Sequence, residues 1–266
     1  MADQYAVIGH PVEHSKSPLI HAAFACQTGQ AIEYGRILAP LGGFRETALR
    51  FRDEGGKGAN VTVPFKLEAF QLATRLSPRA QDAQAVNTLR FDGSEIYGDN
   101  TDGTGLVHDI VHNLHVAISG RRVLLMGAGG AARGVIRPLL EQHPATLTLV
   151  NRSVKKAIEL QQHFGHLEAC GYQQLEGRSF DIVINATSSG LSDELPPLPA
   201  GVFAPHALAY DMMYGRETPF MRFARAQGAR VADGLGMLVE QAAESFLVWR
   251  NIRPDTRPVI AQLRQA

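Results

Sequence analysis

Two side chains in the first half of the sequence, Lys66 and Asp102, are candidates for moving protons. Lys66 follows Pro64 at the end of a β-branched stretch, and Asp102 lies in the compact polar run of residues 99–103. A positioned lysine ammonium can protonate a carbonyl oxygen during reduction, which commonly contributes about 10²–10⁴ in rate, and a nearby aspartate would orient it. Taken singly, such a lysine is more often solvated than catalytic, and residues 99–103 are typical of an Asx turn. Their pairing is therefore a hypothesis that the rest of the sequence has to support.

Other polar side chains come just after predicted strands. These are Ser15, Ser17, Asn60, Thr62 and Asn87. In open parallel sheets, ligands bind at the carboxyl ends of the strands, so we expect these side chains to face a small polar substrate. Ser17 has a structural alternative, because it precedes Pro18 and is a plausible helix N-cap.

A glycine-rich turn follows the apolar strand predicted at residues 122–126. It has the form G-x-G-x-x-A and includes Gly127, Ala128, Gly129, Gly130 and Ala131. With a strand before it and a helix after it, this turn indicates a dinucleotide site, in which free N–H groups at the helix start receive the pyrophosphate. The alternative is a glycine turn with no ligand.

The next predicted strand, residues 146–150, indicates which dinucleotide is bound. An NAD site would show an acidic residue there, whereas this strand is followed by Asn151, Arg152, Ser153 and Lys156. Arginine can fork onto phosphate oxygens and lysine adds a point charge, so the segment favours the 2′-phosphate of NADP. Solvated basic residues at a helix start are the alternative.

The elements that must position these residues alternate between strand and helix. Strands at 5–9, 33–38 and 59–63 are separated by helices at 18–26 and 42–54, and a hairpin is centred on Asp92 and Gly93. A helix at 106–114 precedes a second alternating series that fits a doubly wound sheet. We therefore predict an α/β protein with two domains: a substrate domain with a mostly parallel sheet, and a Rossmann-like NADP-binding domain, with a boundary near residue 102.

The composition of the chain limits the binding partners and the cellular compartment that we expect. The chain has 26 basic and 26 acidic residues, so no net charge recruits nucleic acid. No apolar stretch is long enough to span a membrane, the start lacks the pattern of a secretory signal, and Cys26 and Cys170 stand alone. We expect a cytoplasmic protein without a metal, because the ten histidines are scattered and no zinc signature appears.

At these residues the chain resembles the shikimate dehydrogenase family, the NADP-dependent reductases of chorismate and aromatic amino-acid biosynthesis. The matching segments are 15–18, 60–66, 85–88, 98–103, the turn from Gly127, 185–188, 210–212 and 233–237. The resemblance implies reversible reduction of 3-dehydroshikimate to shikimate by NADPH, with Lys66 as proton donor and acceptor and Asp102 as its partner.

The resemblance also assigns residues that the pattern alone does not reach. It implies that Tyr214 and Gln241 join Ser15, Ser17, Asn60, Thr62, Lys66, Asn87 and Asp102 in binding substrate, and that Met212 and Gly234 lie by the nicotinamide. It implies a discontinuous first domain, residues 1–101 with 238–266, around an NADP-binding domain at 102–237. A monomer or homodimer is expected.

Two alternatives remain open from the sequence. One is a quinate/shikimate dehydrogenase of broader specificity, because the pocket that would admit the extra hydroxyl of quinate depends on loop geometry. The other is a non-catalytic sensor that binds NADP and the acid. The presence of both Lys66 and Asp102 argues against the sensor.

Overall fold

The computed structural model describes residues 2–187 and 194–265, so Ser188, part of one matching segment, lies outside the described residues. The chain forms two compact units, Met1–Gly105 with Leu238–Ala266, and Leu106–Met237. It passes from one unit to the other inside helix α5 (Asp102–His108) and returns inside helix α9 (Leu235–Arg250). Asp102 therefore belongs to the first unit.

The first unit is built on a six-stranded mixed sheet with the order β2-β1-β3-β5-β6-β4. Its strands are β1 (Asp3–Gly9), β2 (Ile32–Leu38), β3 (Gly58–Val61), β4 (Arg75–Leu76), β5 (Thr88–Asp92) and β6 (Glu95–Asp99). β1 pairs in parallel with β2 and β3, whereas β5 runs antiparallel to β3 and β6. The predicted hairpin is confirmed as β5 and β6.

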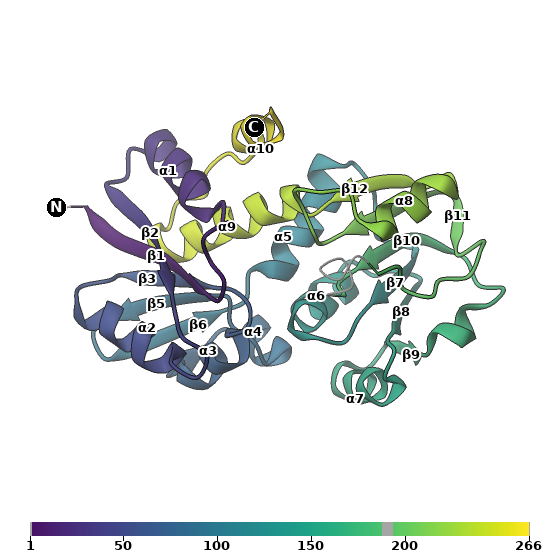
Figure 1. The fold of residues 1–266 in the computed structure, drawn as a ribbon, viewed down its shortest axis with the longest axis horizontal. Helices are drawn as coiled ribbons and strands as arrows, with labels where there is room; N and C mark the ends of the chain where they lie inside the picture. Colours follow the sequence, from purple (N-terminus) through teal and green to yellow (C-terminus); the bar gives the residue numbers. More distant parts are fainter. Residues whose placement is uncertain (1, 188–193, 266) are drawn as a thin grey trace. The chain divides into compact units, whose positions relative to one another are not determined.

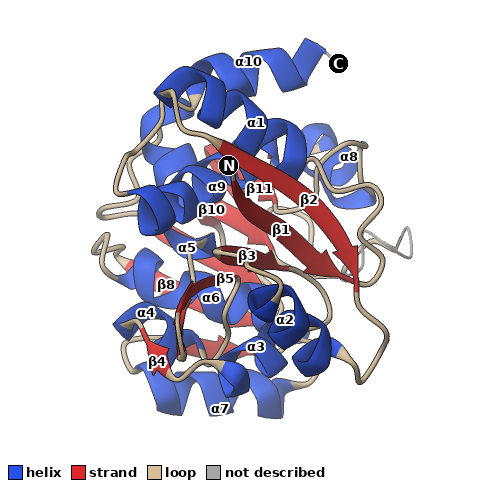
Figure 2. Ribbon diagram, turned by 90° about the vertical axis from the view of Figure 1, so that its left-hand side faces the viewer, coloured by secondary structure: helices blue, strands red, loops and turns tan. Residues whose placement is uncertain are grey.

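Helices cover both faces of this sheet. α1 (Ser17–Thr28) and α9 lie on one face, and α2 (Phe44–Asp53) and α3 (Lys66–Leu72) lie on the other (Figures 1 and 2). Alternation along β1 explains this, because successive side chains of a strand point to opposite faces. Tyr5 meets the Trp249 ring of α9 at 4.6 Å, whereas Ile8 packs with Phe44 and Phe65. The short α4 (Pro78–Ala83) and the terminal α10 (Arg257–Gln265) complete the unit.

The second unit has a fully parallel sheet with the order β12-β11-β10-β7-β8-β9. Its strands are β7 (Arg122–Met126), β8 (Thr146–Val150), β9 (Glu168–Cys170), β10 (Phe180–Asn185), β11 (Phe203–Asp211) and β12 (Arg230–Asp233). Strand order reverses between β7 and β10, which is the switch point where doubly wound sheets bind ligands. The prediction of a Rossmann-like unit is confirmed.

Both faces of that sheet are buried, which explains the continuous apolar run of β7. Val123 and Leu125 pack in a cluster that includes α6 (Gly130–Leu140) and α7 (Val154–Phe164). Leu124 and Met126 point to the opposite cluster, which includes α8 (Pro219–Ala226). A strand covered on both faces has no polar side to show, so it reads as an unbroken hydrophobic segment.

One local prediction was wrong, and one predicted helix is confirmed with an earlier start. Ser17 is not the N-cap of α1: Lys16 holds that position without a side-chain bond, and the Ser15 hydroxyl accepts the N–H of Ser17 at 3.3 Å instead. The helix predicted at residues 106–114 begins earlier, at Asp102, and ends in a π-helical turn, Asp109–Asn113.

No helix among the described residues is long and apolar enough to cross a membrane.

Candidate active site

Lys66 and Asp102 form an ion pair in the first unit. Lys66 is the first residue of α3 and Asp102 the first residue of α5, and Lys66 Nζ donates to Asp102 Oδ2. Their side chains are 20% and 8% exposed, so the pair is largely shielded from solvent. The pair places an oriented proton donor at the carboxyl side of the sheet.

Asn87 holds the other side of the same carboxylate. Its Nδ2 donates to Asp102 Oδ1 at 2.8 Å, and its Oδ1 accepts the backbone N–H of Thr101 at 2.9 Å. Asn87 immediately precedes β5 and is buried. Because both oxygens of Asp102 are bonded, the carboxylate has one orientation.

Asn60 and Gln241 extend this network. Asn60 Nδ2 donates to Ser245 Oγ at 2.9 Å, its Oδ1 accepts from Tyr34 at 2.7 Å, and Gln241 Oε1 accepts from Asn87 at 3.3 Å. Asn60 Nδ2 also lies 3.2 Å from Thr88 Oγ1, to which it donates. Four members of this network were absent from the sequence prediction: Tyr34, Thr88, Thr101 and Ser245. The sequence spacing could have indicated Ser245, because it lies one helical turn after Gln241. In the structure its hydroxyl donates to the backbone oxygen of Gln241 at 3.0 Å.

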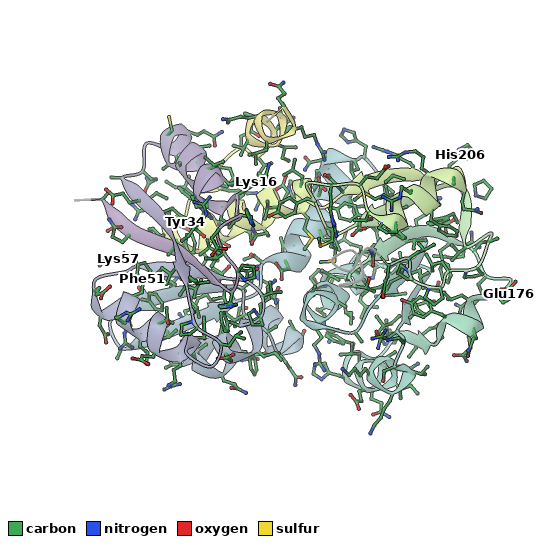
Figure 3. All side chains as sticks on the ribbon, viewed as in Figure 1. Lys16, Tyr34, Phe51, Lys57, Glu176 and His206 are labelled. Carbon is green, nitrogen blue, oxygen red and sulfur yellow. The ribbon has the colours of Figure 1, made fainter. Side chains whose placement is uncertain are left out.

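The two serines after β1 lie together. Ser15 Oγ donates to Ser17 Oγ at 3.1 Å, and the Arg36 guanidinium donates to the Ser15 carbonyl at 2.6 Å and 3.1 Å. Tyr34 (Figure 3) lies between Ser17 and Asn60: burial raises the pKa of its phenol well above the usual value, while bonding to Ser17 acts in the opposite direction.

Thr62 comes directly after β3 and packs against Gly9. A Cβ at Gly9 would come within 2.4 Å of Thr62 Cγ2, so β1 must carry glycine at this point. The structure thus brings the predicted polar residues of the first unit to the carboxyl edge of β1 and β3. Tyr214 belongs to the second unit.

The glycine turn in the second unit fits a pyrophosphate. Gly127 has a φ of +106°, and a Cβ there would lie 3.0 Å from the Ala186 carbonyl oxygen, so only glycine suits this position. α6 then begins at Gly130, and its cap residue Gly129 offers no side-chain bond to the first turn. The uncapped N–H groups point where an anion is favoured, and a Cβ at Gly129 or Gly130 would meet nothing within 4 Å.

The basic segment after β8 fits an additional phosphate. Arg152, Ser153 and Lys156 are exposed at the start of α7, and the Ser153 side chain does not cap that helix. Asn151 Nδ2 donates to the Ser153 carbonyl at 2.9 Å, which shapes the turn. Burial raises the pKa of Tyr172 to about 12, and the positive charge of Arg152 acts against this rise.

Met212 and Gly234 follow β11 and β12 and lie in contact. A Cβ at Gly234 would come within 2.3 Å of the Met212 carbonyl oxygen, and Gly234 donates its N–H to Met213 at 2.9 Å. Together with the turn at Gly127, these residues occupy the carboxyl edge of the parallel sheet.

Three family models match the chain in sequence order. The shikimate dehydrogenase substrate binding domain matches residues 7–89, shikimate / quinate 5-dehydrogenase matches residues 109–192, and the shikimate 5′-dehydrogenase C-terminal domain matches residues 234–264. The shikimate dehydrogenase (NADP(+)) of Methylobacillus flagellatus is 62% identical over 99% of this chain and 100% of its own length.

The chain belongs to the shikimate dehydrogenase family. It is an NADP-dependent oxidoreductase, and solved structures of shikimate dehydrogenases share its fold. An Ael1 enzyme from Pseudomonas putida superposes with a TM-score of 0.95 at 54% identity, covering 98% of both chains. The Thermus thermophilus shikimate 5-dehydrogenase, solved in complex with NADP(H) and shikimate, gives a TM-score of 0.89 at 32% identity and covers 99% of both chains.

Proposed function

We propose that this shikimate dehydrogenase reduces 3-dehydroshikimate to shikimate with Lys66 as the proton donor and Asp102 as the residue that orients it. The observation that carries the proposal is the ion pair between Lys66 Nζ and Asp102 Oδ2, with Asp102 Oδ1 held by Asn87 at 2.8 Å. A proton donor must be positioned before the transition state forms, and this pair is positioned by two helix starts.

When bound, NADPH supplies a hydride to the carbonyl carbon of the substrate. Lys66 then donates a proton from its ammonium to the carbonyl oxygen as negative charge develops there, which gives the alcohol. In the oxidation direction, the neutral Lys66 amine accepts the hydroxyl proton. Asp102 accepts the hydrogen bond from Lys66 and keeps the lysine in place, in the way that an aspartate orients the base of other catalytic pairs.

The polar groups around this pair suit a small acid with ring hydroxyls. We infer that Ser15, Ser17, Asn60, Thr62, Asn87, Gln241 and Tyr214 bind its carboxylate and hydroxyls. Hydroxyl and amide groups both donate and accept, so they can satisfy a polyhydroxylated ring without adding charge. This distribution supports an uncharged ring with a single carboxylate over a phosphorylated substrate.

We infer that the cofactor binds along the carboxyl edge of the second sheet. Gly127, Ala128, Gly129, Gly130 and Ala131 would receive the pyrophosphate, and Asn151, Arg152, Ser153 and Lys156 would hold the ribose and its 2′-phosphate. Met212 and Gly234 would border the nicotinamide. The uncapped start of α6 and the exposed cations at the start of α7 support this placement.

We infer a cytoplasmic enzyme that works as a monomer or homodimer. Cys26 and Cys170 are both free, which agrees with a reducing compartment. Light scattering on the purified protein measures the oligomeric state, and a larger assembly would contradict this part of the proposal.

The test compares Lys66→Met with Lys57→Met. Lys57 is an exposed lysine just before β3, at the opposite end of that strand, and Figure 3 shows it at the margin of the first unit. We expect Lys66→Met to lower kcat for shikimate oxidation by about 10²-fold or more with a nearly unchanged KM, because proton transfer is felt in the transition state. Lys57→Met should retain wild-type kcat.

The same assay is run with shikimate or quinate and with NADP or NAD, following the absorbance of the reduced nicotinamide. Fast reduction of NADP with shikimate alone supports the proposed substrate. Comparable rates with quinate assign the broader specificity, and a fully active Lys66→Met variant removes Lys66 from the mechanism.

A further inference from the structure

One partly buried guanidinium connects the segment that carries Asp102 to the helix that carries Gln241. Arg79, in α4, donates from Nε and Nη2 to the two carboxylate oxygens of Asp99, at 2.7 Å each. Its Nη1 donates to Thr104 Oγ1 at 2.9 Å and to Glu244 Oε1 at 3.0 Å. The Arg79 side chain is 26% exposed and that of Asp99 is 3% exposed, so most of these bonds are shielded from water.

The partners of Arg79 lie on both sides of Asp102. Asp99 ends β6, Asp102 begins α5, and Thr104 follows in the first turn of that helix. Between strand and helix the chain passes through Asn100 and Thr101, which belong to no regular element. A guanidinium that is bonded to both Asp99 and Thr104 therefore fixes the strand end and the helix start between which Asp102 is placed.

The Asp99 carboxylate anchors this arrangement. It also accepts hydrogen bonds from Ser77 Oγ at 2.5 Å and from the N–H of Asn100 at 2.7 Å. Burial by itself would raise the pKa of Asp99, but the bonds from Arg79 and Ser77 reverse this and leave the pKa below its usual value. Asp99 is therefore an ionised partner for Arg79 under the enzyme's working conditions.

Glu244, in α9, connects Arg79 to that helix. It lies one helical turn after Gln241, and its second oxygen accepts from Arg253 Nη1 at 2.6 Å. Arg253 in turn donates from Nη2 to the buried Glu240 at 3.0 Å. α9 is thus held from two sides, and the turn that presents Gln241 to Asn87 has a defined position relative to Arg79.

We propose that Arg79 is a positioning residue for the reaction, which fixes Asp102 against Lys66 and Gln241 against Asn87. Among the described residues the side-chain partners of Arg79 are Asp99, Thr104 and Glu244, and Arg79 acts on Asp102 and Gln241 through them. The inference rests on the proposed roles of Lys66 and Asp102. Misplacement of a reacting group by about 1 Å can cost about 10²-fold in rate, so a distant anchor can control turnover.

The experiment is a double-mutant cycle between Arg79→Met and Lys66→Met, followed by kcat and KM for shikimate and KM for NADP. We expect Arg79→Met to lower kcat by about 10-fold or more and to leave KM for NADP within about twofold, because the basic and glycine segments belong to the other unit. In the Lys66→Met background, Arg79→Met should have little further effect on kcat, because the group that it positions is gone. Arg79→Lys should recover part of the rate.

A matched control removes an arginine fork of the same type from the surface of the same sheet. Arg75 donates to Glu95 from Nε at 3.0 Å and from Nη2 at 2.9 Å, and these side chains are 52% and 40% exposed. Arg75→Met should retain wild-type kcat. A loss equal to that of Arg79→Met would assign the effect to general damage to the sheet and overturn the proposal.

A milder variant covers the case in which Arg79→Met does not fold. Thr104→Val removes one acceptor of Arg79 and leaves the Arg79–Asp99 pair intact, and we expect about a threefold to tenfold loss of kcat. Wild-type kcat in both variants, or the same fold-loss from Arg79→Met with and without Lys66, overturns the proposal. A fully active Lys66→Met variant is a different outcome, since it rejects the proposed function itself.

Discussion

The Asn87 amide and the Asp102 carboxylate form a hydrogen bond of 2.8 Å, on the carboxylate oxygen that Lys66 does not use. Asp102 is therefore held by a cation on one side and by a neutral donor on the other. A neutral donor fixes the geometry without competing with Lys66 for charge. This relationship makes Asn87 part of the Lys66–Asp102 arrangement as well as a candidate ligand of the substrate.

Asn87→Ala removes the neutral donor. We expect kcat/KM for shikimate to fall by about 10- to 100-fold, since a hydrogen bond to a charged group contributes about 1.5–3 kcal/mol. Asn87→Asp should be worse than Asn87→Ala, because it puts a second carboxylate beside Asp102. Steady-state kinetics measure both variants, and an Asn87→Ala enzyme with wild-type kcat/KM would contradict this role.

Arg152→Ala tests the choice between NADP and NAD. Loss of the guanidinium should weaken NADP binding by about 1.5–3 kcal/mol and change NAD binding little, because only NADP carries the 2′-phosphate. Titration calorimetry measures both cofactors. The control is Arg121→Ala. Arg121 is exposed and precedes β7, at the end of the strand away from the glycine turn. Equal losses for NADP and NAD would remove Arg152 from phosphate recognition.

Thr218 should control the loop that carries Met212 and Tyr214. Its hydroxyl donates to Asp211 Oδ2 at 2.5 Å and caps α8 by accepting the N–H of Met221 at 3.3 Å. Asp211 Oδ1 in turn accepts the N–H of Met213 at 3.0 Å, so the bond from Thr218 holds the residue that shapes the loop.

Thr218→Val removes both bonds. We expect a loss of about 1–3 kcal/mol in the free energy of unfolding and a higher KM for shikimate. Urea unfolding and steady-state kinetics check these outcomes. Thr218→Ser keeps the hydroxyl and should behave like the wild type; if it loses as much as Thr218→Val, the methyl group rather than the hydrogen bonds is responsible.

His21 should make the folded protein sensitive to acid. The ring is buried, stacks on Tyr34 at 4.2 Å, and has no hydrogen-bond partner for either nitrogen among the described residues. Burial lowers the pKa of His21 from 6.5 to about 3, with the nearby Asn60 opposing only part of the effect. His21 therefore becomes protonated at a lower pH in the folded state than in the unfolded state.

The free energy of unfolding therefore decreases as pH falls. Stability from neutral His21 is fully present above about pH 6.5 and is lost as pH falls toward about 3, by up to about 1.4 kcal/mol per pH unit. His21→Phe should flatten the dependence of unfolding free energy on pH in this range. His206→Asn, at an exposed histidine (Figure 3), should keep the wild-type slope. An unchanged slope in His21→Phe would contradict the prediction.

Local patterns in the sequence determined the α/β class, the doubly wound unit and the glycine turn. Each depends on residues close in the chain: the apolar run of β7 is buried on both faces, and the turn at Gly127 needs a positive φ. The short spacing of Ser15 and Ser17 also indicated a polar loop. The sequence could not tell that the Ser15 hydroxyl, and not that of Ser17, accepts an N–H group at the start of α1. Which hydroxyl does so depends on the dihedral angles of the loop, and these are not encoded in the spacing of the two serines.

Tertiary structure decided which distant residues complete the site. Ser245 and Gln241 reach Asn60 and Asn87 only because α9 returns to the first sheet, and Tyr34 reaches Asn60 only because β2 and β3 flank β1. Arg79 looks like a surface arginine in a short polar helix until Asp99, Thr104 and Glu244 converge on it. Such contacts join residues far apart in the chain, so no local spacing encodes them; packing of the helices on the sheet brings them together.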